Sequence, residues 1–308
     1  MDGKFIDPDR AYLYRAHPFL ILPCGWEAHS LDARQIDTHG SRNPAAVRYD
    51  AIMPIPERLN PSFAAAWPAA VDPLEEARQR LIVALDVPDA ASALSLVDRL
   101  ESNCRWYKVG LELFIAAGPA VLEPLLKRGH SVFLDLKLHD IPNTVAGAVR
   151  SIAALGVQML TVHAAGGPAM LAAAQAALQD VANPPQLLAV TVLTSMDKAQ
   201  IKAVGLNRTP AQQVELLAHM GLSTGLKGFV CSPQEVSTLR TLTGPEGVLV
   251  IPGIRPAGSG VGDQKRIATP ADALRQGASY LVVGRPITQA ADPADAAEAI
   301  LREMAAAL

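Results

Sequence analysis

Residues 131–144 read Ser-Val-Phe-Leu-Asp-Leu-Lys-Leu-His-Asp-Ile-Pro-Asn-Thr, an apolar segment that runs directly into alternating charges. On an extended backbone Asp135 and Lys137 project to the same side, because side chains alternate along a strand. These charges and Asp140 can be buried at a strand end only if they neutralise one another. Pro142 fixes the backbone just before the next helical segment. The stretch predicts a strand that ends in an active site, although a strand-end salt bridge with a helix cap would give the same short pattern.

The segments on either side repeat one pattern, in which a short apolar run, typical of a parallel strand buried on both faces, precedes a helical segment rich in Ala and Leu. The predicted strands are residues 81–86, 106–109, 131–136, 159–163, 187–193, 228–231, 248–251 and 280–283. The predicted helices are residues 74–80, 90–100, 119–127, 144–154, 168–181, 210–220, 233–240, 270–276 and 293–306. This alternation predicts an α/β protein with a (β/α)8 TIM barrel, whose active site lies at the carboxyl ends of the strands. A doubly wound sheet is the alternative, but no G-x-G-x-x-G motif follows the first predicted strand.

Residues 1–71 differ from the repeating part of the chain, because prolines break each candidate element there before it can lengthen. We expect a mostly irregular N-terminal extension over residues 1–71, with no function assigned. Asp72-Pro73 has the pattern of an N-cap followed by proline at the first helical position, so the barrel catalytic domain is expected to span residues 72–308. The same pair of a capping residue and proline recurs at Thr209, Ser232, Thr269 and Asp292.

Composition narrows the kind of partner. With 308 residues, of which 50% are hydrophobic, the chain can bury one large core. The net charge of −3 indicates neither a nucleic-acid groove nor binding to an anionic membrane, and no apolar run reaches the roughly 18 residues of a membrane span. Three cysteines without C-x-x-C spacing argue against a disulfide framework and a zinc site. We therefore expect a cytoplasmic protein that binds a small metabolite.

Polar residues gather where the predicted strands end. A helix cap or a surface charge would explain any one of them. Chance placement, however, would spread such residues over both faces of the barrel. Their common position predicts a single site at one rim, formed by Asp86, Lys108, Asp135, Lys137, His163, Thr194, Ser195, Arg255 and Arg285.

Several short motifs follow one another in a fixed order along the predicted barrel. The longest is D-L-K-L-H-D-I-P-N-T at residues 135–144. The others are A-L-D at 84–86, Y-K-V-G at 107–110, T-V-H-A at 161–164, T-V-L-T-S at 191–195, P-G-I-R-P at 252–256, D-Q at 263–264 and V-G-R-P at 283–286. On these motifs the chain from about residue 81 onward resembles the orotidine 5′-phosphate decarboxylase family. Residues 1–71 lie outside the resemblance.

The resemblance implies decarboxylation of orotidine 5′-phosphate to uridine 5′-phosphate (UMP), the last step of pyrimidine nucleotide synthesis, with neither metal nor organic cofactor. It implies that Lys137 protonates C6 of the pyrimidine and that Asp135 lies beside the departing carboxylate. The carbanion at C6 has no adjacent π-system to spread its charge, so the site has to stabilise the anion directly. An ammonium between carboxylates stays charged in a dry pocket, because nearby opposite charges offset its desolvation. Lys108, Asp135, Lys137 and Asp140 would form such an array.

The other end of this substrate is a phosphate, which barrels commonly hold in the loops after strands seven and eight. Glycine lets a backbone N–H approach an oxyanion there, and arginine presents a fork of donors that matches a phosphate. Three glycines in residues 257–262 predict a loop that closes over the bound nucleotide. By resemblance, Arg255, Gln264, Gly284 and Arg285 bind the phosphate, Asp86 and Lys108 bind the ribose hydroxyls, and Thr144 and Thr194 complete the substrate-binding set.

In the family, the position of Asp140 reaches across a twofold interface into the neighbouring site, so the resemblance implies an obligate homodimer. Two alternatives stay open. Sugar-phosphate decarboxylases and synthases of the same superfamily share the D-x-K-x-x-D strand and use magnesium, but have an acidic residue where Lys108 stands. The other is a catalytically silent nucleotide-binding protein, although every matched catalytic position is filled. No role is assigned to His139, His163 or Ser195.

Overall fold

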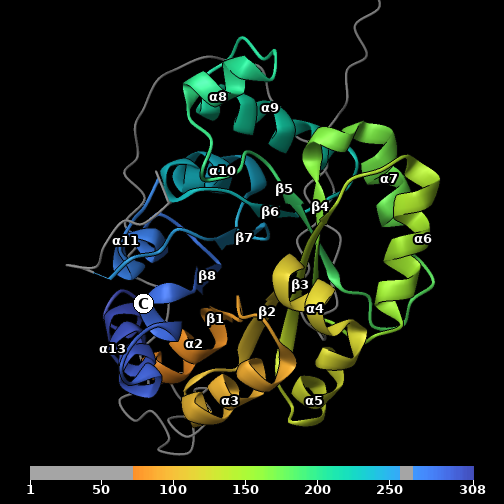
Figure 1. The fold of residues 1–308 in the computed structure, drawn as a ribbon. Helices are drawn as coiled ribbons and strands as arrows, with labels where there is room; N and C mark the ends of the chain where they lie inside the picture. The colour runs from red at the N-terminus through yellow and green to blue at the C-terminus, as the bar shows by residue number, and fades with distance from the viewer. Residues whose placement is uncertain (1–71, 257–265) are drawn as a thin grey trace, which may run out of the picture. The chain divides into compact units, whose positions relative to one another are not determined.

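The computed structural model describes residues 72–256 and 266–308. Parallel strands close into a barrel in chain order, and β8 is hydrogen-bonded back to β1 (Figure 1). The strands are β1 (Leu81–Ala84), β2 (Trp106–Gly110), β3 (Ser131–Leu138), β4 (Met159–His163), β5 (Gln186–Val190), β6 (Gly228–Val230), β7 (Val248–Ile251) and β8 (Tyr280–Val283). The predicted (β/α)8 TIM barrel is therefore confirmed. The extension predicted for residues 1–71 lies outside the described residues.

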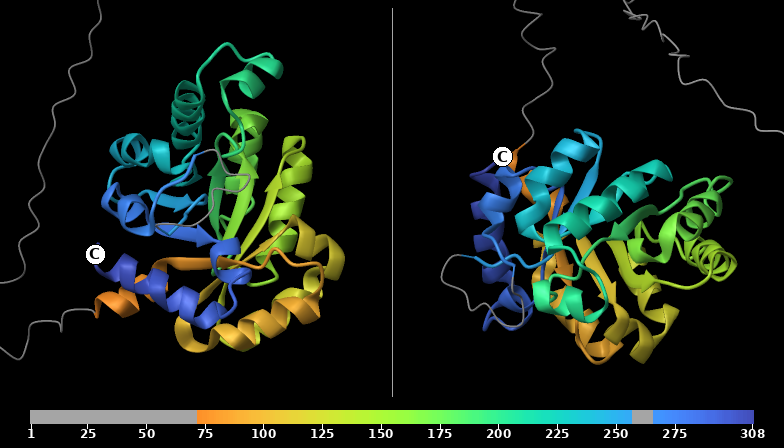
Figure 2. Two further views of the ribbon diagram at one scale, coloured as in Figure 1. Left: turned by 60° about the vertical axis from the view of Figure 1, so that its left-hand side comes forward. Right: turned by 90° about the horizontal axis from the view of Figure 1, so that it is seen from above.

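Helices alternate with the strands and surround the barrel (Figures 1 and 2). They are α2 (Pro73–Arg80), α3 (Ala90–Leu100), α4 (Leu111–Ala117), α5 (Leu122–Lys127), α6 (Pro142–Ala153), α7 (Gly167–Ala176), α8 (Lys198–Ala203), α9 (Pro210–Ser223), α10 (Val236–Thr243), α11 (Pro270–Arg275), α12 (Arg285–Thr288) and α13 (Pro293–Ala305). Helices α4, α8 and α12 were not predicted, because they are too short to show the hydrophobic period of a helix. No helix within the described ranges is both long and apolar enough to cross a membrane.

Side chains cap the helix starts much as the sequence predicts. Asp72, Thr209, Thr269 and Asp292 each accept a backbone N–H from the first turn of the helix that follows, namely α2, α9, α11 and α13. The next residue is proline, whose fixed φ suits the first helical position. Ser232 precedes a 3₁₀ turn, η4 (Pro233–Glu235), and α10 begins only after it. The helix predicted at 233–240 is thus divided into two elements.

Alternation along the strands separates two layers of the core. Ile82, Phe133 and Leu188 belong to the layer inside the barrel, whereas Leu134 packs in the layer between strands and helices. Because side chains alternate, the inward position that follows Phe133 is Asp135. Both of these residues line the same cavity at the barrel mouth. The apolar interior therefore forms the floor beneath the charged residues at the carboxyl ends of the strands.

Candidate active site

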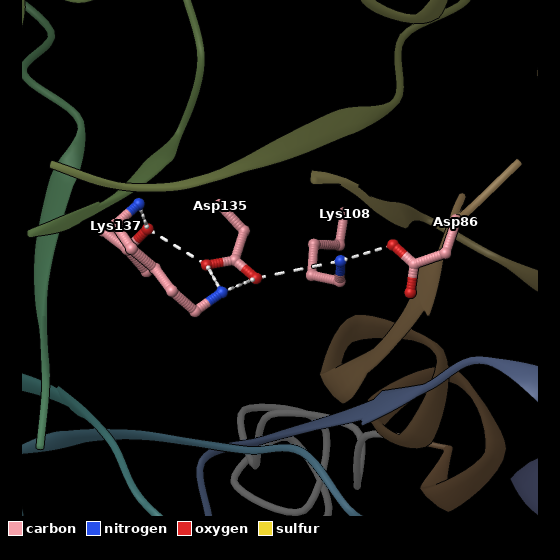
Figure 3. Close-up of polar contacts among 5 residues, drawn as sticks. Asp86, Lys108, Asp135 and Lys137 are labelled. Atoms are coloured by element: carbon pink, nitrogen blue, oxygen red, sulfur yellow. Dashed lines mark hydrogen bonds and ion pairs between the residues drawn. The ribbon is translucent and has the colours of Figure 1, made fainter. Parts of the chain in front are cut away.

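Charged side chains from three neighbouring strands form a row of alternating charge at the rim (Figure 3). Asp86 follows β1, Lys108 is on β2, and Asp135 and Lys137 are on β3. Lys108 Nζ lies 2.8 Å from Asp86 Oδ1 and 3.7 Å from Asp135 Oδ2. Lys137 Nζ lies 2.8 and 2.9 Å from the two carboxylate oxygens of Asp135. The structure thus brings these four predicted residues together, with Asp135 between two ammonium groups.

Lys108 and Asp135 form the enclosed centre of this row, with only 8% and 9% of their surfaces exposed. Burial raises the pKa of Asp135, but the adjacent Lys108 and Lys137 ammonium groups lower it by more, so that the pKa of this carboxyl lies below its usual value. Asp135 is therefore ionised at neutral pH. Opposite charges at close range offset the cost of burying these groups.

The backbone of β3 is irregular where it carries these residues. Leu134 pairs with Leu160 of β4, but the register then shifts, and the next pair is Leu138 with Val162. Lys137 has φ of 51°, the left-handed region that a residue with a side chain seldom adopts. The ion pair of Asp135 and Lys137 agrees with the prediction, whereas the expectation of a regular extended backbone beneath it was wrong. A bulge in β3 turns Lys137 toward its neighbour instead.

Thr161 of β4 is hydrogen-bonded to both Asp135 and Lys137 in the irregular part of β3. The sequence alone did not give it a role. Its Oγ1 accepts the backbone N–H of Lys137 at 2.8 Å and donates to Asp135 Oδ1 at 3.0 Å. The Thr161 side chain is fully buried. In the sequence Thr161 stands out only as the first residue of the T-V-H-A motif and as a hydroxyl among apolar neighbours in the strand Met-Leu-Thr-Val-His.

Gly110, the last residue of β2, leaves the space that the Lys108 ammonium occupies. A Cβ at this position would lie 2.8 Å from Lys108 Nζ and 3.1 Å from Asp86 Oδ1. Its φ of −95° and ψ of −176° are accessible to any residue, so the backbone itself does not require glycine here. A side chain at position 110 would therefore require the Lys108 ammonium and the Asp86 carboxylate to shift from their present positions.

A cavity of about 490 Å³ opens at the barrel mouth and holds most of the predicted site. On one side lie the charged residues of β1 to β3. On the other, after β5, β7 and β8, lie Thr194, Arg255, Gly284 and Arg285. Arg255 is buried and donates to the carbonyl of Ile254 at 2.8 Å, whereas Arg285 is exposed. The cavity thus has two ends above an apolar floor. The charged end carries the row of alternating charge from β1 to β3, and the arginine end carries Arg255 and Arg285.

Two described residues of the predicted catalytic and substrate-binding sets do not line this cavity. Asp140 and Thr144 are exposed, and neither lines it. Asp140 instead lines a separate surface hollow of about 510 Å³ together with Ile141 and Gly166. Gln264 and the closing loop predicted at 257–262 lie outside the described residues. Within one chain, the described residues therefore contribute Lys108, Asp135 and Lys137 to the predicted catalytic array, but not Asp140.

A buried ion pair supports the loop that carries Thr194, and sequence reasoning missed it. Arg266 contacts the Glu235 carboxylate, and both side chains are almost fully buried. Arg266 Nη2 also donates to the carbonyls of Val192 and Leu193, at 3.3 and 2.9 Å. These carbonyls lie just before Thr194, so the pair fixes the end of this loop to the segment after β6.

Two histidines flank the β3 bulge. The rings of His139 and His163 are 5.4 Å apart between centroids. Burial lowers the pKa of His163, and His139 and Lys137 nearby lower it further, so its ring is neutral at pH 7. His163 and Ser195, like His139, are absent from the cavity lining. Within the described ranges, no three His, Cys, Asp or Glu side chains are grouped so that they could hold a metal ion.

Comparison with known proteins places the chain in one family. The family model described as "Orotidine 5′-phosphate decarboxylase / HUMPS family" matches residues 79–300. A protein of Moorella thermoacetica named orotidine 5′-phosphate decarboxylase is 54% identical over 234 residues, which cover 74% of this chain and 93% of the relative. One of the same name from Nitrosococcus oceani is 52% identical over 228 residues, covering 74% of this chain and 98% of the relative.

A solved structure is similar to the same part of the chain. The crystal structure of orotidine 5′-phosphate decarboxylase from Lactobacillus acidophilus matches with a TM-score of 0.64 and 40% sequence identity. The match covers 73% of this chain and 98% of that one. The similarity therefore extends over nearly the whole length of these relatives.

Proposed function

The chain belongs to the orotidine 5′-phosphate decarboxylase / HUMPS family, and on that premise we propose that it is a carboxy-lyase that converts orotidine 5′-phosphate to UMP and CO₂ in pyrimidine nucleotide synthesis. The observation that carries the proposal is the row Asp86, Lys108, Asp135 and Lys137 at the mouth of the barrel, with contacts of 2.8 to 3.7 Å. We place the reaction in the cytoplasm, with no metal or organic cofactor.

The charged row suits a reaction that develops negative charge on carbon. When CO₂ leaves C6 of the pyrimidine, the electron pair of the broken bond stays on C6 as a carbanion. Lys137, held at 2.8 Å by Asp135, supplies a fixed positive charge beside C6 and then donates its proton there. Because Asp135 and Lys108 keep these charges in place before the substrate arrives, little reorganisation is needed during the reaction.

Each end of the cavity suits one part of the nucleotide. Arg285, exposed at the mouth, and Gly284 beside it suit the phosphate, together with Arg255 and Gln264. Asp86 and the ammonium of Lys108 suit the ribose hydroxyls. In this proposal Thr194 contacts the nucleotide from the loop after β5, Thr144 completes the binding set, and residues 257–262 close over it.

The position of Asp140 supports a homodimer. It lies outside the cavity of its own chain, next to Ile141, which is 67% exposed. On α4, Leu111 and Ile115 are also exposed, by 51% and 78%. Exposed large apolar side chains are typical of a surface that another protein covers. We propose that a second copy of the chain covers it and receives Asp140 beside its Lys137 across a twofold axis.

The other branch of the family provides the competing function. Sugar-phosphate decarboxylases and synthases would require an acidic residue where Lys108 stands, to hold magnesium. Here Lys108 is paired with both Asp86 and Asp135, so a cation would meet an ammonium at that position. The assay that separates the functions follows the absorbance of orotidine 5′-phosphate with a chelator present. Turnover is expected to persist, and dependence on added magnesium would contradict the proposal.

A further inference from the structure

We propose that Thr161 is a positioning residue for the decarboxylation, because one hydroxyl fixes both the Asp135 carboxylate and the backbone of Lys137. The inference rests on the function proposed above and deepens it. Thr161 does not line the cavity, so it acts through residues that do.

The two hydrogen bonds of Thr161 have defined directions. The backbone N–H of Lys137 is the donor at 2.8 Å, so one lone pair of the hydroxyl is occupied. The hydroxyl has a single proton, and an ionised carboxylate can only accept. This proton therefore points to Asp135 Oδ1, 3.0 Å away. The hydroxyl cannot turn to another partner without losing one bond.

Lys137 needs this support because the sheet does not provide it. The regular pairing of β3 with β4 stops at Leu134 and resumes at Leu138, so the bulge has no ladder partner in this register. Lys137 also has φ of 51°, and among the described residues no other with a side chain has a positive φ. Such a conformation persists only where the surroundings determine it. The Lys137 N–H is instead bonded to the Thr161 hydroxyl of β4 at 2.8 Å.

Both ends of the Asp135–Lys137 ion pair thus depend on the same buried atom. Without it, the Lys137 backbone can relax toward an extended conformation and Asp135 Oδ1 loses a donor. Either change moves the ammonium that faces C6. Both hydrogen bonds of Thr161 go to Asp135 and Lys137, which are not among the residues proposed for the phosphate and ribose. The defect should therefore appear in kcat and not in nucleotide affinity.

The test compares Thr161→Val, which keeps the shape and removes the hydroxyl, with Thr161→Ser, which keeps the hydroxyl. A hydrogen bond to a charged group contributes enough that kcat of Thr161→Val is expected to fall roughly 10- to 100-fold. UMP affinity, measured by calorimetry, is expected to stay within about threefold of wild type. Thr161→Ser is expected to recover most of the lost kcat. Unchanged kcat in Thr161→Val, or UMP affinity falling in proportion to kcat, overturns the proposal.

Thr191 provides a matched control on the neighbouring strand end. It is buried, and its hydroxyl donates to the carbonyl of Val230 at 3.0 Å, away from the charged row. Thr191→Val is expected to lower the melting temperature without changing kcat. If Thr161→Val does not fold, Thr161→Ala and Thr161→Ser still differ only by the hydroxyl, and equal kcat in these two overturns the proposal. Wild-type protein that does not turn over orotidine 5′-phosphate would instead refute the proposed function.

Discussion

Substitution of Gly110 by alanine tests how closely the charged row depends on the space beside it. The new Cβ would lie 2.8 Å from Lys108 Nζ, and the ammonium has to move by about 0.6 Å to reach the 3.4 Å of ordinary contact. It is held at 2.8 Å by Asp86, whose Oδ1 would itself lie 3.1 Å from the Cβ. The added methyl group therefore disturbs both partners of the ion pair.

Misplacement of a catalytic group by up to 1 Å costs as much as about 100-fold in rate, so kcat/KM of Gly110→Ala is expected to fall roughly 10- to 100-fold. Stability should hardly change. The backbone of Gly110 is accessible to alanine, and Gly→Ala restricts the unfolded chain, so the free energy of unfolding is expected to stay within about 1 kcal/mol of wild type. Absorbance-based turnover and urea unfolding measure the two quantities.

Gly118, at the other end of α4, is the matched control. Its φ of 66° disfavours alanine, but a Cβ there would meet nothing within 4 Å. Gly118→Ala is expected to lose about 1–3 kcal/mol of stability and to keep its kcat/KM. The two substitutions are thus expected to have opposite effects: Gly110→Ala lowers activity and hardly changes stability, whereas Gly118→Ala lowers stability and hardly changes activity. If Gly110→Ala is folded and its kcat/KM stays within about threefold of wild type, the reasoning about Lys108 is refuted.

Arg285→Ala is expected to lower kcat/KM at least about 100-fold, because phosphate contacts stabilise both substrate and transition state; an unchanged value would place the phosphate site elsewhere. Lys137→Ala and Asp140→Ala are each expected to be inactive, but after subunit exchange a heterodimer has one intact site and should recover up to about half the wild-type activity. A mixture that stays inactive despite proven exchange would mean that Asp140 acts within its own chain. Removal of residues 1–71 is expected to leave turnover intact, because the family match begins at residue 79, and a soluble but inactive product would contradict this. Burial raises the pKa of Cys104 to about 12, so its thiol stays protonated at pH 8 and should react with iodoacetamide only after unfolding, as site-resolved mass spectrometry would report.

The sequence was sufficient to predict the barrel and the polar residues at the carboxyl ends of its strands. Strand periodicity and the cap-proline pairs are local signals, and they predicted all eight strands to within a few residues. The ion pair of Asp135 and Lys137 could likewise be predicted, because opposite charges at alternate positions of a strand lie on the same side of it.

What the sequence did not predict depends on contacts between distant segments. The left-handed backbone of Lys137 is tied to a hydroxyl on the next strand, and no local pattern in β3 indicates it. The crowding that a side chain at Gly110 would meet arises from the Lys108 ammonium beside it, and not from a turn. The pairing of Arg266 with Glu235 joins residues 31 positions apart that only the closed barrel brings together.

The division of the cavity between its charged end and its arginine end bears on how such a site can diversify. The charged row is carried by β1 to β3, and the arginines follow β7 and β8, so the two groups are encoded far apart in the chain. In the proposed function, a mutation at the β1–β3 end can change which bond is broken without moving the residues proposed for the phosphate. Under that proposal, selection can act on the chemistry and on phosphate retention separately, which lets one barrel lineage acquire new reactions on substrates that share a phosphate.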